Sequence, residues 1–150
     1  MFLRVKKVKG KEYCYLVENK KSGQKVKKYL GAAVRLESKK GFFDRAVNGK
    51  AEDILRGVVL WELAKAGFAG EEKMVKDDVV FNNMRLRRSG KKVVLAINDG
   101  YLCDFTLKRI LAFRRSRDIE SDSLELARRF VDAGLGVPKD AFVAVYHALG

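Results

Sequence analysis

The acidic residues that could support chemistry in this sequence occur in pairs. Asp99 and Asp104 form the most open pair, and the others are adjacent: Glu52/Asp53, Glu71/Glu72 and Asp77/Asp78. Two carboxylates can hold Mg²⁺ for cleavage of a phosphodiester bond. Adjacent carboxylates are more often solvated charge, and Asp99 and Asp104 also suit a turn and a helix start. A metal-dependent nuclease is therefore the least favoured hypothesis, and we predict neither a metal site nor a cofactor.

The other reactive side chains are few. His147, the single histidine, is followed only by Ala148, Leu149 and Gly150, and it is a poor basis for acid–base catalysis. Cys14 and Cys103 stand in apolar contexts without the paired spacing of a metal site, which predicts buried free thiols. A Gly-rich phosphate loop and a Gly-x-Ser-x-Gly motif are both missing from the sequence. We expect a non-enzymatic protein with no catalytic residue.

Positive charge is concentrated at the start of the chain. The formal net charge is +13, and residues 1–50 carry fifteen basic and four acidic side chains, a net of +11. Residues 51–150 carry seventeen basic and fifteen acidic side chains, a net of +2. A localised excess of this kind is typical of proteins that bind a phosphate backbone.

Residues 1–31 hold ten Lys or Arg against two acids, and they have the pattern of a small antiparallel sheet. Three strands are expected at 2–8, 12–18 and 24–30, with turns around Lys9-Gly10-Lys11 and residues 19–23. A two-stranded ribbon alone is only marginally stable. We therefore expect three strands that lay an aliphatic and tyrosine face on the rest of the protein.

The tyrosines of this module have two possible roles. In the second strand, alternation places Tyr13 and Tyr15 on the face opposite to Cys14. In the third strand, it places Val26 and Leu30 on one face and Tyr29, with lysines beside it, on the other. Exposed tyrosines could stack on unpaired bases. We expect Tyr13 and Tyr15 to be core residues, and the pattern leaves Tyr29 open between the two roles.

Two runs in this module resemble known proteins. Val-Lys-Gly-Lys-Glu-Tyr-Cys-Tyr-Leu-Val-Glu begins at Val8, and Gly-Gln-Lys-Val-Lys-Lys-Tyr-Leu-Gly begins at Gly23. Together they resemble the N-terminal basic hairpin of some insertion-sequence transposases and of some prokaryotic Fic-domain proteins. The catalytic parts of both families are not matched. The His-Pro-Phe-type loop of Fic enzymes has no counterpart around His147, and a transposase of this kind needs a large nuclease domain with separated acidic residues, whereas 119 residues remain after the module. The resemblance therefore implies a shared accessory module rather than a shared activity.

The rest of the chain is expected to complete an α+β fold. Residues 32–49 are interpreted as a connector and residues 50–150 as a mainly helical region, packed with the module as one domain. Apolar periodicity predicts helices at 50–66, 101–115, 124–133 and 138–149. A second β-hairpin is favoured for Val79–Arg88 and Lys91–Asn98 around Ser89-Gly90, with a helix over 91–98 as the alternative.

These observations predict a protein that binds nucleic acid through phosphate contacts and with low sequence specificity, with DNA favoured over RNA. The alternative is an accessory or regulatory module of a mobile-element or toxin-like system that docks an acidic protein. The sequence lacks an apolar run of the roughly 20 residues that span a bilayer, and its start lacks a signal-peptide core, so we expect a cytoplasmic protein without a membrane partner. The oligomeric state is left open. The predicted binding residues are Arg4, Lys6, Lys7, Lys9, Lys11, Lys25, Lys27, Lys28, Arg85, Arg87, Arg88, Lys91 and Lys92.

Overall fold

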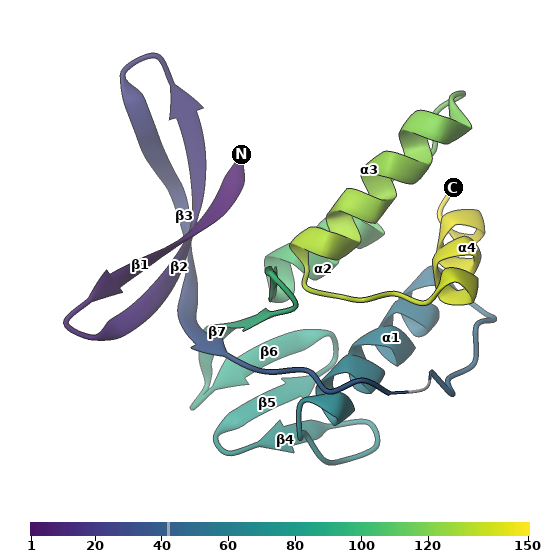
Figure 1. Cartoon of the computed structure of the whole chain (residues 1–150), viewed down its shortest axis with the longest axis horizontal. Coiled ribbons are helices and arrows are strands. Elements are labelled where there is room, and N and C mark those ends of the chain that lie inside the picture. Colours follow the sequence, from purple (N-terminus) through teal and green to yellow (C-terminus); the bar gives the residue numbers. More distant parts are fainter. Residues whose placement is uncertain (42) are drawn as a thin grey trace.

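The computed structural model describes residues 1–41 and 43–150 as a mixed α+β protein (Figure 1). Helices account for 32% of it and strands for 35%. The prediction of an α+β fold is confirmed, but the expectation that residues 50–150 are mainly helical is wrong. That region contributes five strands as well as the four helices of the described chain.

The first three strands form an antiparallel meander. They are β1 (Phe2–Val8), β2 (Lys11–Lys20) and β3 (Gly23–Arg35), and we call this unit the N-terminal meander. In Figure 1 it lies on one side of the molecule, with the helices on the other. The predicted strands are confirmed, although β3 runs past the predicted end of the module into the segment interpreted as a connector. Phe42, one of the apolar residues of that segment, lies outside the described residues.

The last part of β3 connects the meander to the rest of the sheet. It pairs in parallel with β7 (Lys91–Ile97), from Ala32 opposite Val93 to Arg35 opposite Ala96. The strand order is β1-β2-β3-β7-β6-β5-β4, and β8 also pairs with β7. Two basic segments that are far apart in the sequence therefore become neighbours in one sheet.

The remaining strands are short and joined by tight turns. They are β4 (Met74–Lys76), β5 (Val79–Asn82), β6 (Arg85–Arg88) and β8 (Gly100–Leu102). The predicted hairpin is confirmed as β6 and β7, and the helical alternative for 91–98 is wrong. The predicted run 79–88 is divided into two strands because Asn83 and Met84 both take a positive φ, of 51° and 60°, and reverse the chain.

The four helices are α1 (Ala51–Lys65), α2 (Asp104–Leu111), α3 (Ile119–Asp132) and α4 (Lys139–Ala148). Two of them differ from the predicted ranges. Helix α2 begins late because Gly100–Leu102 pairs with β7 as β8. Helix α3 begins early because the Asp118 carboxylate caps it, accepting hydrogen bonds from the backbone N–H groups of Glu120 and Ser121.

The core has two parts, on opposite faces of β7. Val93, Leu95 and Ile97 join the larger cluster, in which α1 packs with α2, α3 and α4. Val94 points the other way and joins Cys14, Leu16, Leu30 and Cys103 in a smaller cluster. This smaller cluster fixes the N-terminal meander against β7, β8 and the start of α2.

Candidate nucleic-acid interface

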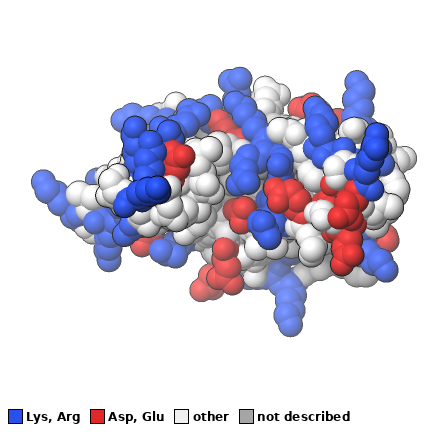
Figure 2. Space-filling model, turned by 90° about the horizontal axis from the view of Figure 1, so that it is seen from above, with Lys and Arg blue, Asp and Glu red and all other residues white. Residues whose placement is uncertain are grey.

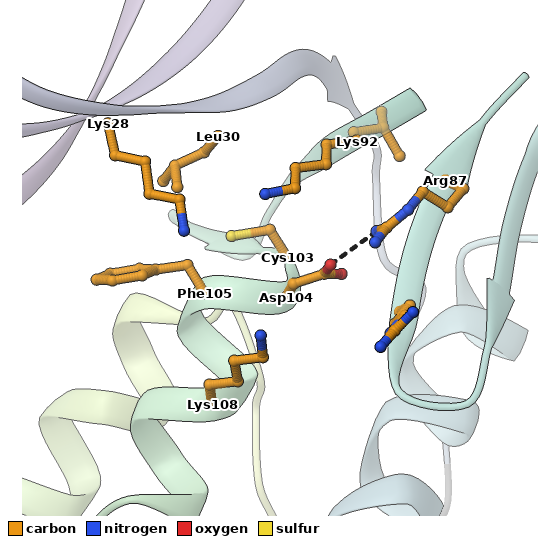
Figure 3. Close-up of a pocket in the computed structure, with 10 residues that line it drawn as sticks. Lys28, Leu30, Arg87, Lys92, Cys103, Asp104, Phe105 and Lys108 are labelled. Atoms are coloured by element: carbon orange, nitrogen blue, oxygen red, sulfur yellow. Dashed lines mark hydrogen bonds and ion pairs between the residues drawn. The ribbon is translucent and has the colours of Figure 1, made fainter. Parts of the chain in front are cut away.

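The two predicted basic segments meet in a pocket between β3, β6, β7 and α2 (Figure 3). The pocket has a volume of about 240 Å³. We call it the basic pocket, and five cations from these elements line it: Lys28, Arg85, Arg87, Lys92 and Lys108. Leu30, Val93, Cys103 and Phe105 supply its apolar lining. Lys28 and Lys108 are both exposed, so an anion can reach them from solvent.

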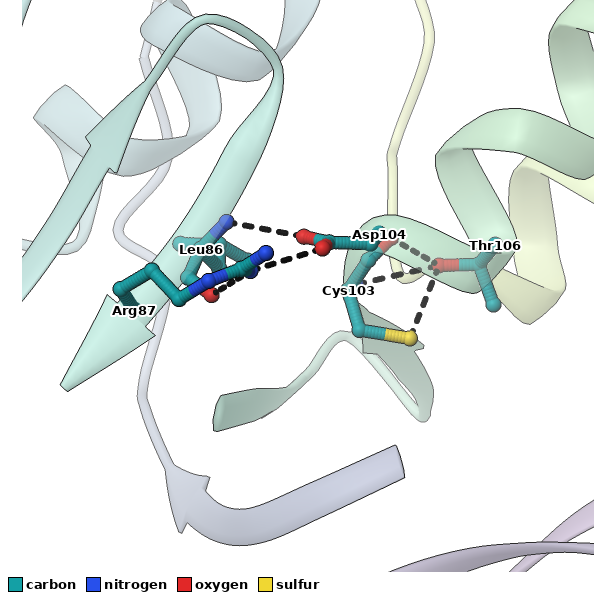
Figure 4. Close-up of polar contacts among 5 residues, drawn as sticks. All are labelled: Leu86, Arg87, Cys103, Asp104 and Thr106. Carbon is teal, nitrogen blue, oxygen red and sulfur yellow. Dashed lines mark hydrogen bonds and ion pairs between the residues drawn. The ribbon is translucent and has the colours of Figure 1, made fainter. Parts of the chain in front are cut away.

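Asp104 is the single carboxylate among the described lining residues of the basic pocket, and it is already engaged (Figure 4). Its Oδ2 accepts a hydrogen bond of 2.7 Å from Nη1 of Arg87, and its Oδ1 accepts one of 3.0 Å from the backbone N–H of Leu86. Arg87 also donates to the carbonyl oxygen of Leu86 at 2.7 Å. These bonds fix the start of α2 to β6, and they leave the pocket with a large excess of positive charge.

The start of α2 is held in place by Thr106 (Figure 4). The backbone N–H of Cys103 donates to Oγ1 of Thr106 at 3.1 Å, and this hydroxyl lies 2.8 Å from the carbonyl oxygen of Tyr101. Burial raises the pKa of the Cys103 thiol above its usual value. It also raises the pKa of Cys14 to about 12. Both thiols are free and buried, as predicted, and at neutral pH they are protonated and poorly reactive.

Two further pockets carry basic side chains. One, of about 430 Å³, shares Arg85 and Arg87 with the basic pocket and extends to Asn82 and Asn83 at the β5–β6 turn. The other, of about 440 Å³, brings Lys7 and Lys11 together with Arg88 and Arg35. Arg35 is paired there with Glu12 at 2.9 Å, and Arg88 with Asp78 at 3.4 Å. Figure 2 shows the corresponding distribution, with Lys and Arg gathered over the meander at the left and most acids towards the right.

The structure thus places seven of the thirteen predicted binding residues in two pockets. Lys28, Arg85, Arg87 and Lys92 line the basic pocket, and Lys7, Lys11 and Arg88 line the pocket beside the β1–β2 turn. The others are dispersed. Lys9 lies in that turn, Lys91 begins β7, Lys27 is paired with Glu18 at 3.0 Å, and Lys25 stands opposite Glu18 in the strand register. Arg4 and Lys6 project from the tyrosine-bearing face of the meander.

Lys108 and Arg35 were missed by the sequence interpretation. Lys108 follows Asp104 by four residues, which is the spacing of neighbours on one helix face. That spacing could have placed it beside Asp104 once the helix start was known. Arg35 lies in a segment interpreted as a connector, and its position depends on the pairing of β3 with β7.

Tyr13 and Tyr15 are not core residues, contrary to the prediction. The face of the meander that packs on the protein carries Cys14, Leu16 and Leu30. Neither hydrophobic cluster of the described residues includes a tyrosine of the meander. The expected alternation fails in β3 because two bulges shift its register, so Val26 and Tyr29 lie opposite Val17 and Tyr15 on the outer face.

The candidate metal ligands do not converge. Asp99 lies in the turn between β7 and β8 and lines other pockets, whereas Asp104 is bonded to β6. Within residues 1–41 and 43–150, no group of three or more His, Cys, Asp or Glu side chains is placed to hold a metal ion. His147 is exposed, and its ring packs edge-on against Tyr146.

None of the helices in the described residues has the length and apolar character needed to cross a membrane. Comparison of the chain with protein-family models, curated proteins and solved structures finds no match in any of the three.

Proposed function

We propose that this protein binds nucleic acid through its phosphate backbone and with little sequence preference. The basic pocket is the observation that carries the proposal. Five cations from β3, β6, β7 and α2 converge on one cavity, and its single described carboxylate is already paired with Arg87. Like charges that line one cavity repel one another, and an anion bound from solution reduces this repulsion.

An extended polyanion suits this surface better than a single small anion. The basic pocket is continuous with the groove towards Asn82 and Asn83 because Arg85 and Arg87 line both. The pocket at Lys7 and Lys11, which Ala32 and Arg35 of β3 also line, adds a further basic site. A chain of phosphates can occupy such separate sites at once.

Low sequence preference follows from the kind of side chains present. Lysine presents a compact point charge that contacts phosphate oxygens, and such contacts position a nucleic acid without reading its bases. Lys28, Lys92 and Lys108 are of this kind. The binding should therefore depend steeply on salt, because each neutralised phosphate releases counterions.

The test is fluorescence anisotropy of labelled single-stranded DNA, duplex DNA and duplex RNA of equal length, titrated over a range of salt concentrations. The test variant changes Lys28, Lys92 and Lys108 to Ala. The matched control changes Lys39, Lys40 and Lys139 to Ala, which removes the same charge from exposed positions outside the basic pocket.

We expect the test variant to bind more weakly. The slope of its log affinity against log salt concentration should become less negative by about 2–3, since each lost phosphate contact changes this slope by about 0.9. The control should change little. Failure of the unmodified protein to bind any of the three ligands at low salt would overturn the proposal. An acidic protein partner, sought by pull-down, would then be the leading hypothesis.

A further inference from the structure

We propose that the outer face of the N-terminal meander is a stacking platform for the bases of an unpaired nucleic-acid strand. This inference rests on the nucleic-acid binding proposed above, and it names the form of nucleic acid that this protein prefers. The platform consists of Tyr13, Tyr15 and Tyr29, with Arg4 and Lys6 beside them.

Strand register places these five side chains on one face. Arg4 stands opposite Tyr15, Lys6 opposite Tyr13, and Tyr15 opposite Tyr29. Residues directly opposite each other in antiparallel strands project to the same side of the sheet. Cys14 and Leu16 alternate with the tyrosines of β2 and point into the smaller core cluster, so the tyrosines point away from it.

The rings form a contiguous and accessible aromatic surface. The ring centroids of Tyr15 and Tyr29 are 5.3 Å apart at an interplanar angle of 52°, and those of Tyr13 and Tyr29 are 6.3 Å apart at 49°. At these angles the rings are tilted against one another rather than stacked face to face. Tyr29 is 47% exposed, and Phe2 and Val26 extend the exposed apolar surface beyond it. Contiguous exposed apolar surface is a feature of interaction sites on soluble proteins.

The charges on this face select the partner. Nζ of Lys6 lies 5.4 Å from the centroid of the Tyr15 ring, and Arg4 donates a hydrogen bond to Oε1 of Gln24 across β2. The two acids of the meander, Glu12 and Glu18, occupy even positions of β2 and project from the opposite face. On such a face the aromatic rings can stack on bases, and the cations can contact the phosphates that join them. An apolar protein surface would gain nothing from Arg4 and Lys6.

The strand must be unpaired because a duplex buries the faces of its bases. Stacking on aromatic side chains requires bases that are free to turn towards the protein, and it tolerates any sequence because every base has a π-face. A tyrosine is uncharged at neutral pH, and burial with the neighbouring Tyr15 and Tyr13 raises the pKa of Tyr29 further. The platform therefore adds attraction for bases without repelling the phosphates between them.

The test compares labelled probes of equal phosphate number in fluorescence anisotropy: oligothymidylate of about 20 nucleotides, an abasic strand of the same length, and a duplex. We expect oligothymidylate to bind the full-length protein at least about fivefold more tightly than the abasic strand, and more tightly than the duplex. Oligouridylate in a parallel titration tells whether the sugar matters.

Two substitutions assign the effect to the ring. Tyr29→Leu should weaken oligothymidylate binding at least about fivefold and leave abasic-strand binding unchanged, whereas Tyr29→Phe should keep both. Lys28→Ala is the matched control and should weaken binding to all probes alike. Thermal denaturation confirms that each variant is folded.

The two proposals fail differently. Equal affinity for oligothymidylate and the abasic strand, with no specific loss in Tyr29→Leu, overturns the stacking platform and leaves phosphate binding intact. A preference for the duplex also overturns it. Failure to bind any probe overturns the proposed function and the platform with it.

Discussion

Gly31 lies so close to Lys92 that a Cβ atom on Gly31 would be 2.5 Å from the Lys92 carbonyl oxygen. This approach is where β3 meets β7, and it sets the N-terminal meander against the rest of the sheet. As a result, Lys28 and Lys92 line the same pocket although they are far apart in the sequence. The candidate interface therefore depends on a backbone contact as much as on its charges.

Replacing Gly31 with Ala should destabilise the protein strongly. Gly31 has a φ of +134°, which disfavours any side chain, and the new methyl group would meet the backbone of Lys92. We expect a loss of about 3 kcal/mol or more in the free energy of unfolding, measured by urea denaturation. Gly23→Ala is the control because Gly23 also has a positive φ, of +115°, but nothing within 4 Å of the added carbon. An equal loss in both variants would show that the contact with Lys92 does not matter.

The outline of the meander follows from the sequence, and its orientation does not. Lys9-Gly10 and the alternation from Tyr13 to Val17 are local signals, and they predicted β1 and β2 nearly to the residue. Which face is covered depends on the pairing of β3 with β7 and on two bulges in β3, and no local pattern reports these. Tyr13 and Tyr15 were therefore assigned to the wrong environment.

The basic pocket was predictable only in part. The cations around Ser89-Gly90 and in the third strand were identified by composition, but their convergence required a parallel pairing between distant segments. The role of Asp104 was also hidden, because its bonds reach across to Leu86 and Arg87 on another element. The sequence offers a metal ligand only as the least favoured alternative and a helix start as the other role of Asp104, and α2 does begin at this residue. Its bond to β6 has no local signal in the sequence.

Glu62 should be the most costly carboxylate to remove. It is fully buried in α1, where its Oε2 accepts a hydrogen bond of 2.9 Å from Nδ2 of Asn98 and its Oε1 lies 3.1 Å from Nζ of Lys65. Glu62→Ala would leave the largely buried Lys65 ammonium without this partner, at a cost of about 3 kcal/mol in the free energy of unfolding. The exposed Glu52, changed to Ala in the same helix, should cost well under about 1 kcal/mol in urea denaturation. Equal costs for the two variants would contradict this account.

Ionisation of the Cys14 thiol should lower the stability of the protein at alkaline pH. Its pKa is raised to about 12, from an ordinary value of 9.0, first by burial and then by the nearby Cys103. The unfolded chain therefore releases this proton at lower pH than the folded protein does. The stabilisation is complete well below pH 9 and is lost as the pH rises through 9 towards 12, by about 1.4 kcal/mol at pH 10.

Urea denaturation between these pH values tests this expectation, with Cys14→Ala as the comparison. The variant should be less stable at pH 8, but its stability should fall less steeply with pH. The pKa values of Cys103 and Tyr29 are also raised, so part of the dependence of stability on pH remains in both proteins. Identical slopes would rule out a contribution from Cys14.

Replacing Asp104 with Asn should lower stability and raise affinity for nucleic acid. The Asn oxygen can still accept from the backbone N–H of Leu86, but the charge that holds Arg87 at 2.7 Å is gone. We expect a loss of about 1–2 kcal/mol in the free energy of unfolding. The freed guanidinium becomes available to a phosphate, so affinity at moderate salt should rise about fivefold and the salt dependence should steepen by about 0.9 units.

Asp99→Asn separates this effect from a simple change in net charge. It removes one negative charge from the β7–β8 turn, at a backbone conformation that Asn tolerates, and outside the basic pocket. Anisotropy titrations should therefore show a clear gain in affinity for the Asp104 variant and a small gain for the Asp99 variant. Equal gains would show that only the net charge of the protein matters, and not the pairing of Asp104 with Arg87. If the protein cleaved the probe in the presence of Mg²⁺, and if either substitution abolished that cleavage, the two carboxylates would instead belong to a nuclease site. The opposite signs expected for stability and affinity at Asp104 arise from one interaction, because the carboxylate that fixes α2 to β6 is also the one that neutralises the pocket.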